Sequence, residues 1–230
     1  MGNGGRTALS IERHDAEPPR EEKQAPGVNW DQTFREGKWE YLHSIAETPR
    51  YAAVAGYVHK LLRQGNLLDA GCGEGLLVDY LNINRIRYTG FDLSPTAIHR
   101  AREQYGALTF LPCSFDDFTP PGRETYDVIV FNEALTSLER PIEILNRFYA
   151  FLRPSGHIII SQFQHPDPNS NAIVFTRALG VEITAGRYPV VTESEVLNCE
   201  TGLRWRVYCL SDLRRSGEPS SDSAAPERGV

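Results

Sequence analysis

Short apolar runs alternate with segments of helical period through the middle of the chain. The runs predict strands, and the apolar residues repeated every three or four positions between them predict amphipathic helices. This alternation favours a parallel sheet covered by helices on both faces. The predicted strands are Asn66–Asp69, Arg87–Phe91, Leu108–Pro112, Tyr126–Phe131 and His157–Gln162, and the predicted helices are Tyr51–Leu62, Pro95–Tyr105 and Pro141–Leu152.

The last part of this pattern differs from the rest. Tyr188–Leu197 and Leu203–Leu210 predict two strands joined by a turn around Glu200-Thr201-Gly202, which indicates a hairpin rather than another helical crossover. The predicted fold class is therefore α/β, a doubly wound and mostly parallel sheet that ends in an antiparallel C-terminal hairpin.

Both ends of the chain lack apolar periodicity. Residues 1–27 and 214–230 are rich in Gly, Pro, Ser and charged residues, so we expect disordered tails around one domain over residues 28–213. No apolar run reaches the length of about 18 residues that a membrane span requires, and Met1–Ser10 lacks the apolar core of a secretory signal. The expected location is the cytoplasm, with no membrane partner.

Composition narrows the possible partners. The chain has 24 Lys and Arg against 30 Asp and Glu, a formal net charge of -6, which disfavours an electrostatic nucleic-acid binder. The four cysteines form no C-x-x-C pair and the six histidines show no metal-binding spacing. No metal site is predicted.

A loop with glycine at every second position follows the first predicted strand. Asp69 ends that strand, and Gly71, Gly73 and Gly75 lead into a short helical segment, Leu76–Leu81. Glycines allow a sharp turn and let a ligand lie against the main chain, and a helix N-terminus offers free N–H groups. In doubly wound sheets, ligands bind at the carboxyl ends of the strands.

Two further strand ends point into the same crevice. Asp92 follows the second strand, seventeen residues after Gly75, where its carboxylate can accept hydrogen bonds from both ribose hydroxyls. Asn132 and Glu133 end the fourth strand. Dinucleotide binding uses the same topology, but its G-x-G-x-x-G pattern requires glycine where Leu76 stands. The loop spacing therefore argues against an NAD enzyme.

Four segments taken in order resemble the motifs of class I S-adenosylmethionine-dependent methyltransferases. These are LLDAGCGEG, GFDLS, YDVIVFNEAL and FLRPSGHIIIS, and the resemblance covers about residues 50–163. It implies a Rossmann-like seven-stranded sheet and a transferase that uses S-adenosyl-L-methionine for methylation and releases S-adenosyl-L-homocysteine. The cofactor contacts that it implies are Asp69, Gly71, Cys72, Gly73, Gly75, Asp92, Leu93, Ser114, Phe115 and Asn132.

The same resemblance gives these contacts different roles. Asp69 and the glycine loop would line the methionine part, Asp92 would hold the ribose, and Leu93 would lie beside the adenine. Ser114 and Phe115 stand where the family usually has an acidic residue followed by a small one.

The acceptor side is defined mainly by what is missing. The family's N-P-P-Y or D-P-P-Y tetrad is replaced by Asn132-Glu133-Ala134-Leu135, which resembles the members that methylate O or N of a small molecule. Such an acceptor would be a metabolite or a natural-product intermediate. Many of those members carry a histidine where Ser137 stands. Glu133 and His165 are therefore the candidate catalytic residues, and their ordinary alternatives are a helix-start carboxylate and a loop histidine.

An aromatic segment precedes the first strand. In the family, such segments fold over cofactor and acceptor, so residues of about 28–62 are expected to form a helical lid. Simple packing of these side chains on the sheet is the alternative. The expected substrate and lid residues are Trp30, Phe34, Trp39, Tyr41, Arg50 and Tyr51, of which Arg50 or Tyr51 would contact the cofactor carboxylate.

Three alternatives to a small-molecule methyltransferase stay open at this point. They are a non-catalytic cofactor-binding protein of the same fold, an RNA methyltransferase and, third, an NAD enzyme. The expected partner is a small-molecule acceptor, and the expected state is a monomer or a homodimer.

Overall fold

A computed structural model describes residues 29–212, so the two predicted tails lie outside the described residues. Seven strands form one sheet in the order β3-β2-β1-β4-β5-β7-β6. The pairs among β1 to β5 are parallel, and β7 pairs antiparallel with β5 and β6, which confirms the predicted fold class. The strands are β1 Gly65–Ala70, β2 Ile86–Asp92, β3 Thr109–Pro112, β4 Tyr126–Asn132, β5 Leu152–Phe163, β6 Val190–Leu197 and β7 Arg204–Ser211.

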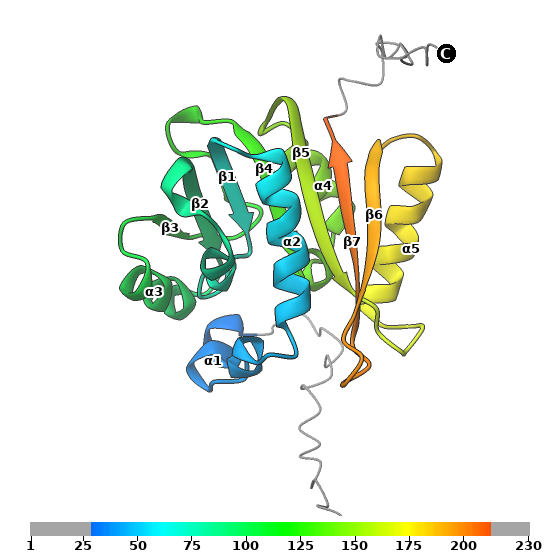
Figure 1. The fold of residues 1–230 in the computed structure, drawn as a ribbon, viewed down its shortest axis with the longest axis horizontal. Coiled ribbons are helices and arrows are strands. Elements are labelled where there is room, and N and C mark those ends of the chain that lie inside the picture. Colours follow the sequence, from blue (N-terminus) through cyan, green and yellow to red (C-terminus); the bar gives the residue numbers. More distant parts are fainter. Residues whose placement is uncertain (1–28, 213–230) are drawn as a thin grey trace, which may run out of the picture.

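Helices cover both faces of this sheet. Figure 1 shows α2 in front of the strands and α4 and α5 behind them. Successive strand residues point to opposite faces, so Leu67 packs with the α2 side and Leu68 with the α4 and α5 side. The helices are α1 Trp30–Arg35, α2 Thr48–Leu61, α3 Pro95–Gln104, α4 Pro141–Tyr149 and α5 Asn171–Thr184.

The structure corrects two boundaries near the fifth strand. α4 ends at Tyr149 and not at Leu152, and the Arg153–Gly156 segment, which lies between the predicted helix and the predicted strand, is inside β5. Tyr126 pairs with Leu152 while Val128 pairs with His157, so the extra residues form an irregularity within the strand pairing. Glycine and proline in this segment therefore mark a bulge and not only a turn.

The sequence analysis assigned no element between His165 and Tyr188, where the structure has α5. Ala172, Phe175 and Leu179 are buried at helical spacing, and the Ser170 hydroxyl accepts from the Ile173 N–H at 3.3 Å. None of the helices among residues 29–212 has the length and apolar character needed to cross a bilayer.

The N-terminal part of the described chain lies at one end of the sheet. In Figure 1, the β1 arrow points toward α1, so α1 lies near the carboxyl ends of the parallel strands. The predicted candidate residues lie at this end, in the loops after β1, β2, β3 and β4.

Candidate functional site

The glycine loop turns sharply back against β2. The N–H groups of Gly71 and Cys72 both donate to the Phe91 carbonyl, each at 2.9 Å. Gly71, Gly73 and Gly75 have φ of 77°, 54° and 82°, where side chains are strained. A β-carbon on Gly71 would also lie 2.7 Å from the Ala134 β-carbon. This backbone conformation therefore requires glycine.

The helical segment predicted after this loop is shorter than expected. It is a 3-10 helix, Leu76–Tyr80, and not an α-helix over Leu76–Leu81. A single 3-10 turn has few aligned peptide groups, so the expected dipole of a helix N-terminus is largely missing. The polar groups of the site must come from the strand ends instead.

Asp92 is fixed at the mouth of the glycine loop. Its two carboxylate oxygens accept hydrogen bonds from the N–H groups of Gly73 and Ser94, both at 2.9 Å. Burial raises the pKa of Asp92, and these N–H donors oppose that shift. Each oxygen keeps acceptor capacity, because a carboxylate oxygen has two lone pairs. The Asp92 carboxylate is thus held in place and can still accept further hydrogen bonds from a ligand.

Asp69 lies deeper than Asp92. It is 2% exposed, and its carboxyl group accepts a hydrogen bond from the Tyr88 hydroxyl at 2.7 Å. Burial raises the pKa of Asp69 to about 7 against the effect of that hydrogen bond. Cys72, the next predicted contact, has a thiol whose pKa burial also raises.

Apolar side chains lie after β2 and β3. Leu93 is 53% exposed, and the Phe115 ring packs edge-on against Phe91 at 5.0 Å. The Ser114 hydroxyl donates to the Asp117 carboxylate at 2.6 Å and accepts from the Asp117 N–H at 3.1 Å. Asp117 was not predicted, although its S-x-x-D spacing is typical of such a local pair.

A buried ion pair connects α2 to the end of β4. Arg50 is 2% exposed, and its Nε and Nη2 donate to the Glu47 carboxylate at 3.1 and 2.9 Å. Its Nη1 donates to Asn132 Oδ1 at 2.7 Å, and its guanidinium lies 4.3 Å from the centre of the Tyr51 ring. The structure thus joins three predicted residues and adds Glu47. The i, i+3 spacing of Glu47 and Arg50 is the only sequence signal for that pair.

Glu133 has an unusual backbone for its residue type. Its φ is 63°, and its N–H donates to the Ser161 carbonyl at 3.2 Å. The Ser161 hydroxyl donates to Glu133 Oε1 at 3.2 Å, so the side chain faces β5. The next 3-10 helix, Leu135–Ser137, has Ala134 as its N-cap residue, whose side chain makes no capping hydrogen bond. Left-handed backbone in a residue other than glycine is often retained for function.

The surroundings of Glu133 bring the pKa of its carboxyl group close to neutral. Burial raises the pKa of Glu133 to about 7. Arg50, the Phe163 N–H and the Ser161 hydroxyl favour the charged form and limit this rise. A group with this pKa gains and loses a proton near neutral pH, which is what a general base requires.

His165, the second catalytic candidate, lies two residues beyond β5. Its Nδ1 accepts from the Asp167 N–H at 3.0 Å, and its ring packs edge-on against Phe163 at 5.9 Å. Its Nε2 is buried and has no hydrogen-bond partner among the described residues. The His165 ring and the Glu133 carboxyl group therefore both contact Phe163, the last residue of β5.

The predicted lid aromatics form one cluster. Trp39 lies 5.9 Å from Trp30, 6.1 Å from Phe34 and 5.9 Å from Tyr41, measured between ring centres. The Phe34 ring also covers the glycine loop, because a β-carbon on Gly73 would lie 3.4 Å from Phe34 Cζ. The structure therefore places the predicted lid directly over part of the predicted cofactor loop.

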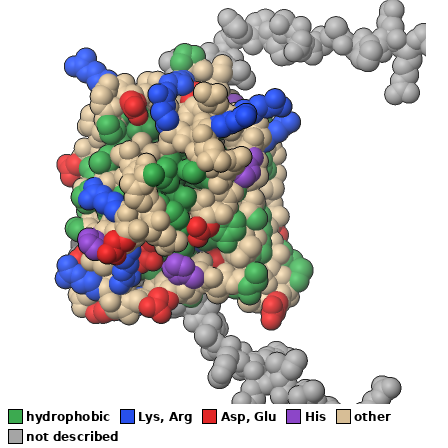
Figure 2. Space-filling view, turned by 60° about the vertical axis from the view of Figure 1, so that its left-hand side comes forward, with side chains coloured by type: hydrophobic (Ala, Val, Ile, Leu, Met, Phe, Trp, Pro, Cys, Tyr) green, Lys and Arg blue, Asp and Glu red, His purple; other side chains and the backbone are tan. Residues whose placement is uncertain are grey.

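Polar contacts fix the same segment to α3. Asp31 Oδ1 accepts from the Ser94 hydroxyl at 2.9 Å and from the Thr96 N–H at 2.8 Å. Glu74 of the glycine loop pairs with Arg100 at 2.6 Å and with His43 at 3.3 Å. Asp31 and Glu74 were missed because both contacts join segments that are distant along the chain. Figure 2 shows acidic and basic side chains intermixed on a face of the molecule.

These features define a class of protein: a doubly wound α/β protein with a glycine loop and buried carboxyl groups at the carboxyl ends of its strands, the edge where such folds bind ligands. A profile of the methyltransferase domain matches residues 39–199, and the chain belongs to this methyltransferase family. The recognised family is thereby confirmed.

Sequence and structure comparisons agree with this assignment. The chain is 29% identical over 99 residues to a ubiquinone biosynthesis O-methyltransferase of Vibrio campbellii, covering 41% of this chain and 42% of the relative. The chain thus spans about half the length of the curated relatives it matches.

Two solved structures share the fold. One is the N-methyltransferase NodS of Bradyrhizobium japonicum WM9 in complex with S-adenosylhomocysteine (TM-score 0.62, 17% identity, 79% of this chain and 97% of that one). The other is the Burkholderia thailandensis 1,6-didemethyltoxoflavin-N1-methyltransferase with its acceptor and S-adenosylhomocysteine bound (TM-score 0.62, 21% identity, 79% and 84%).

Proposed function

We propose that this protein binds S-adenosyl-L-methionine at the carboxyl ends of β1 and β2 and methylates O or N of a small molecule. The observation that carries the proposal is Asp92, whose carboxylate is held by the Gly73 and Ser94 N–H groups beside three glycines of positive φ. The activities named for its relatives, O-methylation and N-methylation, support the same reaction.

The residues present fit this cofactor. Ribose hydroxyls donate hydrogen bonds, and Asp92 offers acceptor oxygens where the backbone approaches closely. Leu93 and Phe115 offer apolar surface for a base. The carboxyl groups of Asp69 and Glu133 suit a cationic ligand, because ionisation of each carboxyl group is costly without a positive charge nearby.

The bound cofactor would supply an electrophilic methyl group. The chain's own contribution is to align the acceptor, to exclude water and to accept a proton. We assign the proton to the Glu133 carboxylate, since an O or N acceptor that gains a methyl group must lose its proton. Trp39 and Tyr41 in the lid cluster would cover the acceptor.

Calorimetry with S-adenosylhomocysteine tests the binding step. We expect saturable binding, and Asp92→Ala should weaken it at least tenfold, about 1.4 kcal/mol. Asp116→Ala is the matched control, because Asp116 is an exposed acid on a neighbouring loop that pairs only weakly with Arg140, at 3.6 Å. Equal affinity of wild type and Asp92→Ala would refute the proposed binding of the cofactor by Asp92, provided that thermal melting shows both proteins to be folded.

Turnover is tested separately. Incubation with an isotopically methyl-labelled donor and metabolite extracts, followed by mass spectrometry, should give a labelled product that identifies both the acceptor and the atom. Binding without consumption of the donor under any extract would instead favour a non-catalytic cofactor-binding protein. Label in added tRNA would favour an RNA methyltransferase.

A further inference from the structure

One buried cation acts on three carboxyl groups near the carboxyl ends of the strands. Arg50 is 2% exposed, and Glu47, its acidic partner, is 5% exposed. Burial raises the pKa of Glu133 and of Asp69, and in both cases the charge of Arg50 opposes that rise. One positive charge cannot neutralise three ionised carboxyl groups, so the contacts of Arg50 decide which of them it favours.

Glu47 holds two of the three side-chain nitrogens of Arg50. Nε and Nη2 both donate to Glu47 Oε2, at 3.1 and 2.9 Å, and Nη1 donates to Asn132 Oδ1 at 2.7 Å. Because the guanidinium is planar, these three contacts fix its orientation. Arg50 thus meets Glu47 through direct charge-assisted hydrogen bonds, whereas it acts on Glu133 through its charge.

Asn132 and Ser161 connect this ion pair to Glu133. Asn132 precedes Glu133 in the chain and pairs with Ser161 in the register of β4 and β5. The Ser161 carbonyl accepts from the Glu133 N–H, and the Ser161 hydroxyl donates to Glu133 Oε1, both at 3.2 Å. The amide that Arg50 holds and the Glu133 carboxyl group therefore lie on adjacent residues that are fixed to the same strand.

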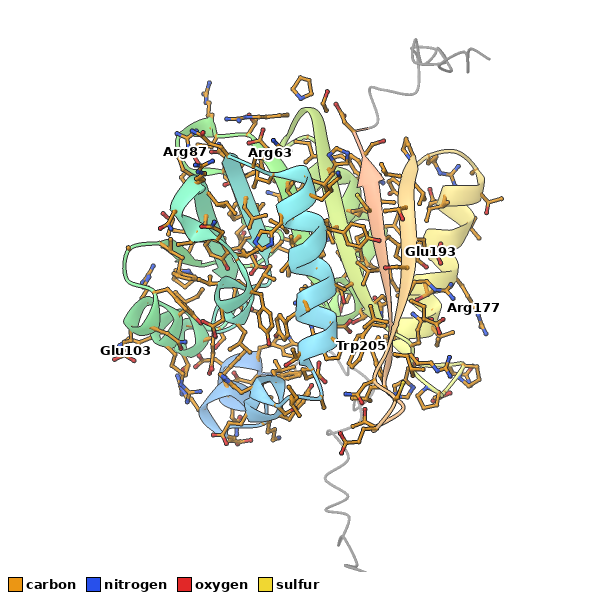
Figure 3. All side chains as sticks on the ribbon, in the orientation of Figure 1. Arg63, Arg87, Glu103, Arg177, Glu193 and Trp205 are labelled. Carbon is orange, nitrogen blue, oxygen red and sulfur yellow. The ribbon has the colours of Figure 1, made fainter. Side chains whose placement is uncertain are left out.

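The β6–β7 hairpin holds the segment that carries Glu47. Asn198, in the turn between these strands, donates from Nδ2 to the Ala46 carbonyl at 3.1 Å. Trp205 of β7 is 2% exposed and lies 6.2 Å from the Phe163 ring, and Figure 3 labels it at the end of the sheet where α2 begins. Surroundings that exclude water strengthen charge interactions, because the local dielectric constant is low. Charges on α2 therefore reach the end of β4 with little screening.

The lid contributes a neutral group to this site. Burial raises the pKa of Tyr41, Glu47 and Glu133 raise it further, and Arg50 opposes them. Burial likewise raises the pKa of Tyr51, so both phenols are neutral at neutral pH. Among the described residues, the charges that act most strongly on Glu133 are therefore those of Arg50 and Glu47.

We propose that Glu47 is a positioning residue that acts on Glu133 through Arg50. Glu47 holds the guanidinium and offsets its charge, so Arg50 orients Asn132 without becoming the full counter-ion of Glu133. A carboxylate fully paired with arginine would be too weak a base. The proposal rests on the proposed function, since only a proton-accepting role requires Glu133 to exchange a proton near neutral pH.

NMR of protein isotopically labelled at the glutamate carboxyl carbons tests this role. The Glu133 signal is assigned by its loss in Glu133→Gln, and its titration gives the pKa directly. In Glu47→Gln the charge of Arg50 is no longer offset, so we expect the pKa of Glu133 to fall by about one unit, a tenfold rise in its dissociation constant. In Glu47→Asp, whose side chain is one methylene shorter, the pKa of Glu133 should fall by a smaller amount.

Glu143→Gln is the matched control. Glu143 also pairs with an arginine at i, i+3 spacing, Arg140, at 3.1 Å, but both side chains are exposed at the start of α4. This variant should leave the titration of Glu133 unchanged. Thermal melting shows which variants are folded, and Glu47→Asp decides the question if Glu47→Gln does not fold.

The route through Arg50 is tested in an Arg50→Met background. There, Glu47→Gln should shift the pKa of Glu133 by about half as much or less, whereas direct repulsion between the two carboxylates would give the full shift. A folded Glu47→Gln variant in which the pKa of Glu133 is unchanged or raised would overturn the proposal, and so would a full shift without Arg50.

The pH dependence of turnover provides a second readout. With an acceptor in hand, the rise of the methyl-transfer rate with pH should move to lower pH in Glu47→Gln by the same amount as the titration, and an unmoved rise would contradict the proposal. The titration itself needs neither donor nor acceptor. An unchanged titration therefore refutes the role of Glu47, whereas a wild type that transfers no methyl group refutes the proposed reaction.

Discussion

Glu133 combines a strained backbone with a buried carboxyl group at the end of β4. Glu133 has a left-handed φ of 63°, and a glycine at this position would relieve the backbone strain. The chain nevertheless has a glutamate there. Its neighbours explain the direction of the side chain, since the Ser161 hydroxyl holds one carboxyl oxygen. The same neighbours leave it able to exchange a proton near neutral pH.

Glu133→Gln should separate catalysis from binding. If Glu133 is the base, methyl transfer should fall by about 100-fold or more, while S-adenosylhomocysteine affinity changes little. The wild-type rate should rise with pH through about 7, because the carboxylate is the active form, and the variant should lose this rise.

Glu139→Gln, on an exposed carboxyl group beyond the 3-10 helix, is the control and should leave both rate and profile unchanged. A variant Glu133→Gln with the wild-type profile would transfer the role to another group. His165→Ala would then be the next variant to measure, because its Nε2 is buried without a described partner.

Residue-level prediction succeeded where local sequence fixes position. Asp92 is the last residue of β2 and Asp69 is the last but one of β1, so the order of the strands alone brings them to one edge. Glu47, Asp31 and Asp117 were not predicted. The contact of Asp31 with Ser94 spans 63 residues, and that of Arg50 with Asn132 spans 82. Only tertiary packing creates such distant neighbours, so spacing carries no signal for Asp31. Glu47 and Asp117 have only the weak local signal of an i, i+3 pair, with Arg50 and with Ser114.

At the level of elements, α1 and α3 are joined by one carboxylate. Asp31 of α1 accepts from Ser94 and Thr96 at the start of α3, where the Ser94 hydroxyl also accepts from the Ala97 N–H. Ser94 is two residues from Asp92, which accepts from its N–H. The lid is therefore attached to the residues beside the proposed ribose site.

Asp31→Ala should loosen the lid without unfolding the sheet. Hydrogen exchange of residues 30–43 should accelerate severalfold, and cofactor affinity should decrease, because two donors on α3 lose their acceptor. Melting of the core should stay nearly constant, since α1 contributes only Phe34 to the buried apolar residues.

Glu36→Ala is the comparison, because Glu36 lies in the same segment and contacts only Gln32 and Lys38 there. Unchanged exchange in Asp31→Ala would mean that the aromatic cluster alone holds the lid in place.

The elements themselves were predictable to different degrees. The inner parallel strands β1, β2 and β4 read as nearly continuous apolar runs, because both of their faces are covered. The start of β5 was missed because Arg153–Gly156 has the composition of a turn but forms a bulge. α5 was missed because exposed Val174 and Val181 break its amphipathic pattern. Prediction of these elements from the sequence thus failed where the local composition favours one structure and the packing of the fold imposes another.

Across the whole molecule, the acidic charge is partly concentrated within the proposed cofactor site. The chain carries a formal charge of -6, and Asp69, Asp92 and Glu133 lie at the same edge of the sheet. Burial raises the pKa of all three, with no fully compensating cation among their described contacts. Burying these carboxyl groups lowers the free energy of unfolding of the unliganded protein, at the place where a cationic ligand is expected to bind.

This arrangement predicts how stability depends on pH. Folding raises the pKa of Asp69 from 3.8 to about 7 and that of Glu133 from 4.5 to about 7. Between these values the folded state binds more protons than the unfolded state, so the free energy of unfolding must fall as pH rises. Because one unit of pKa shift corresponds to about 1.4 kcal/mol, we expect a loss of at least about 1 kcal/mol between pH of about 5 and 8.

Denaturant unfolding at a series of pH values measures this loss directly. The double variant Asp69→Asn and Glu133→Gln should flatten the profile, because neither amide titrates and Tyr88 can still donate to the amide oxygen at position 69. Glu124→Gln, at an exposed position, should retain the wild-type slope. A wild-type stability that rises over this range would show that both carboxyl groups are compensated in the folded protein, and the proposed attraction for a sulfonium ligand would lose its basis.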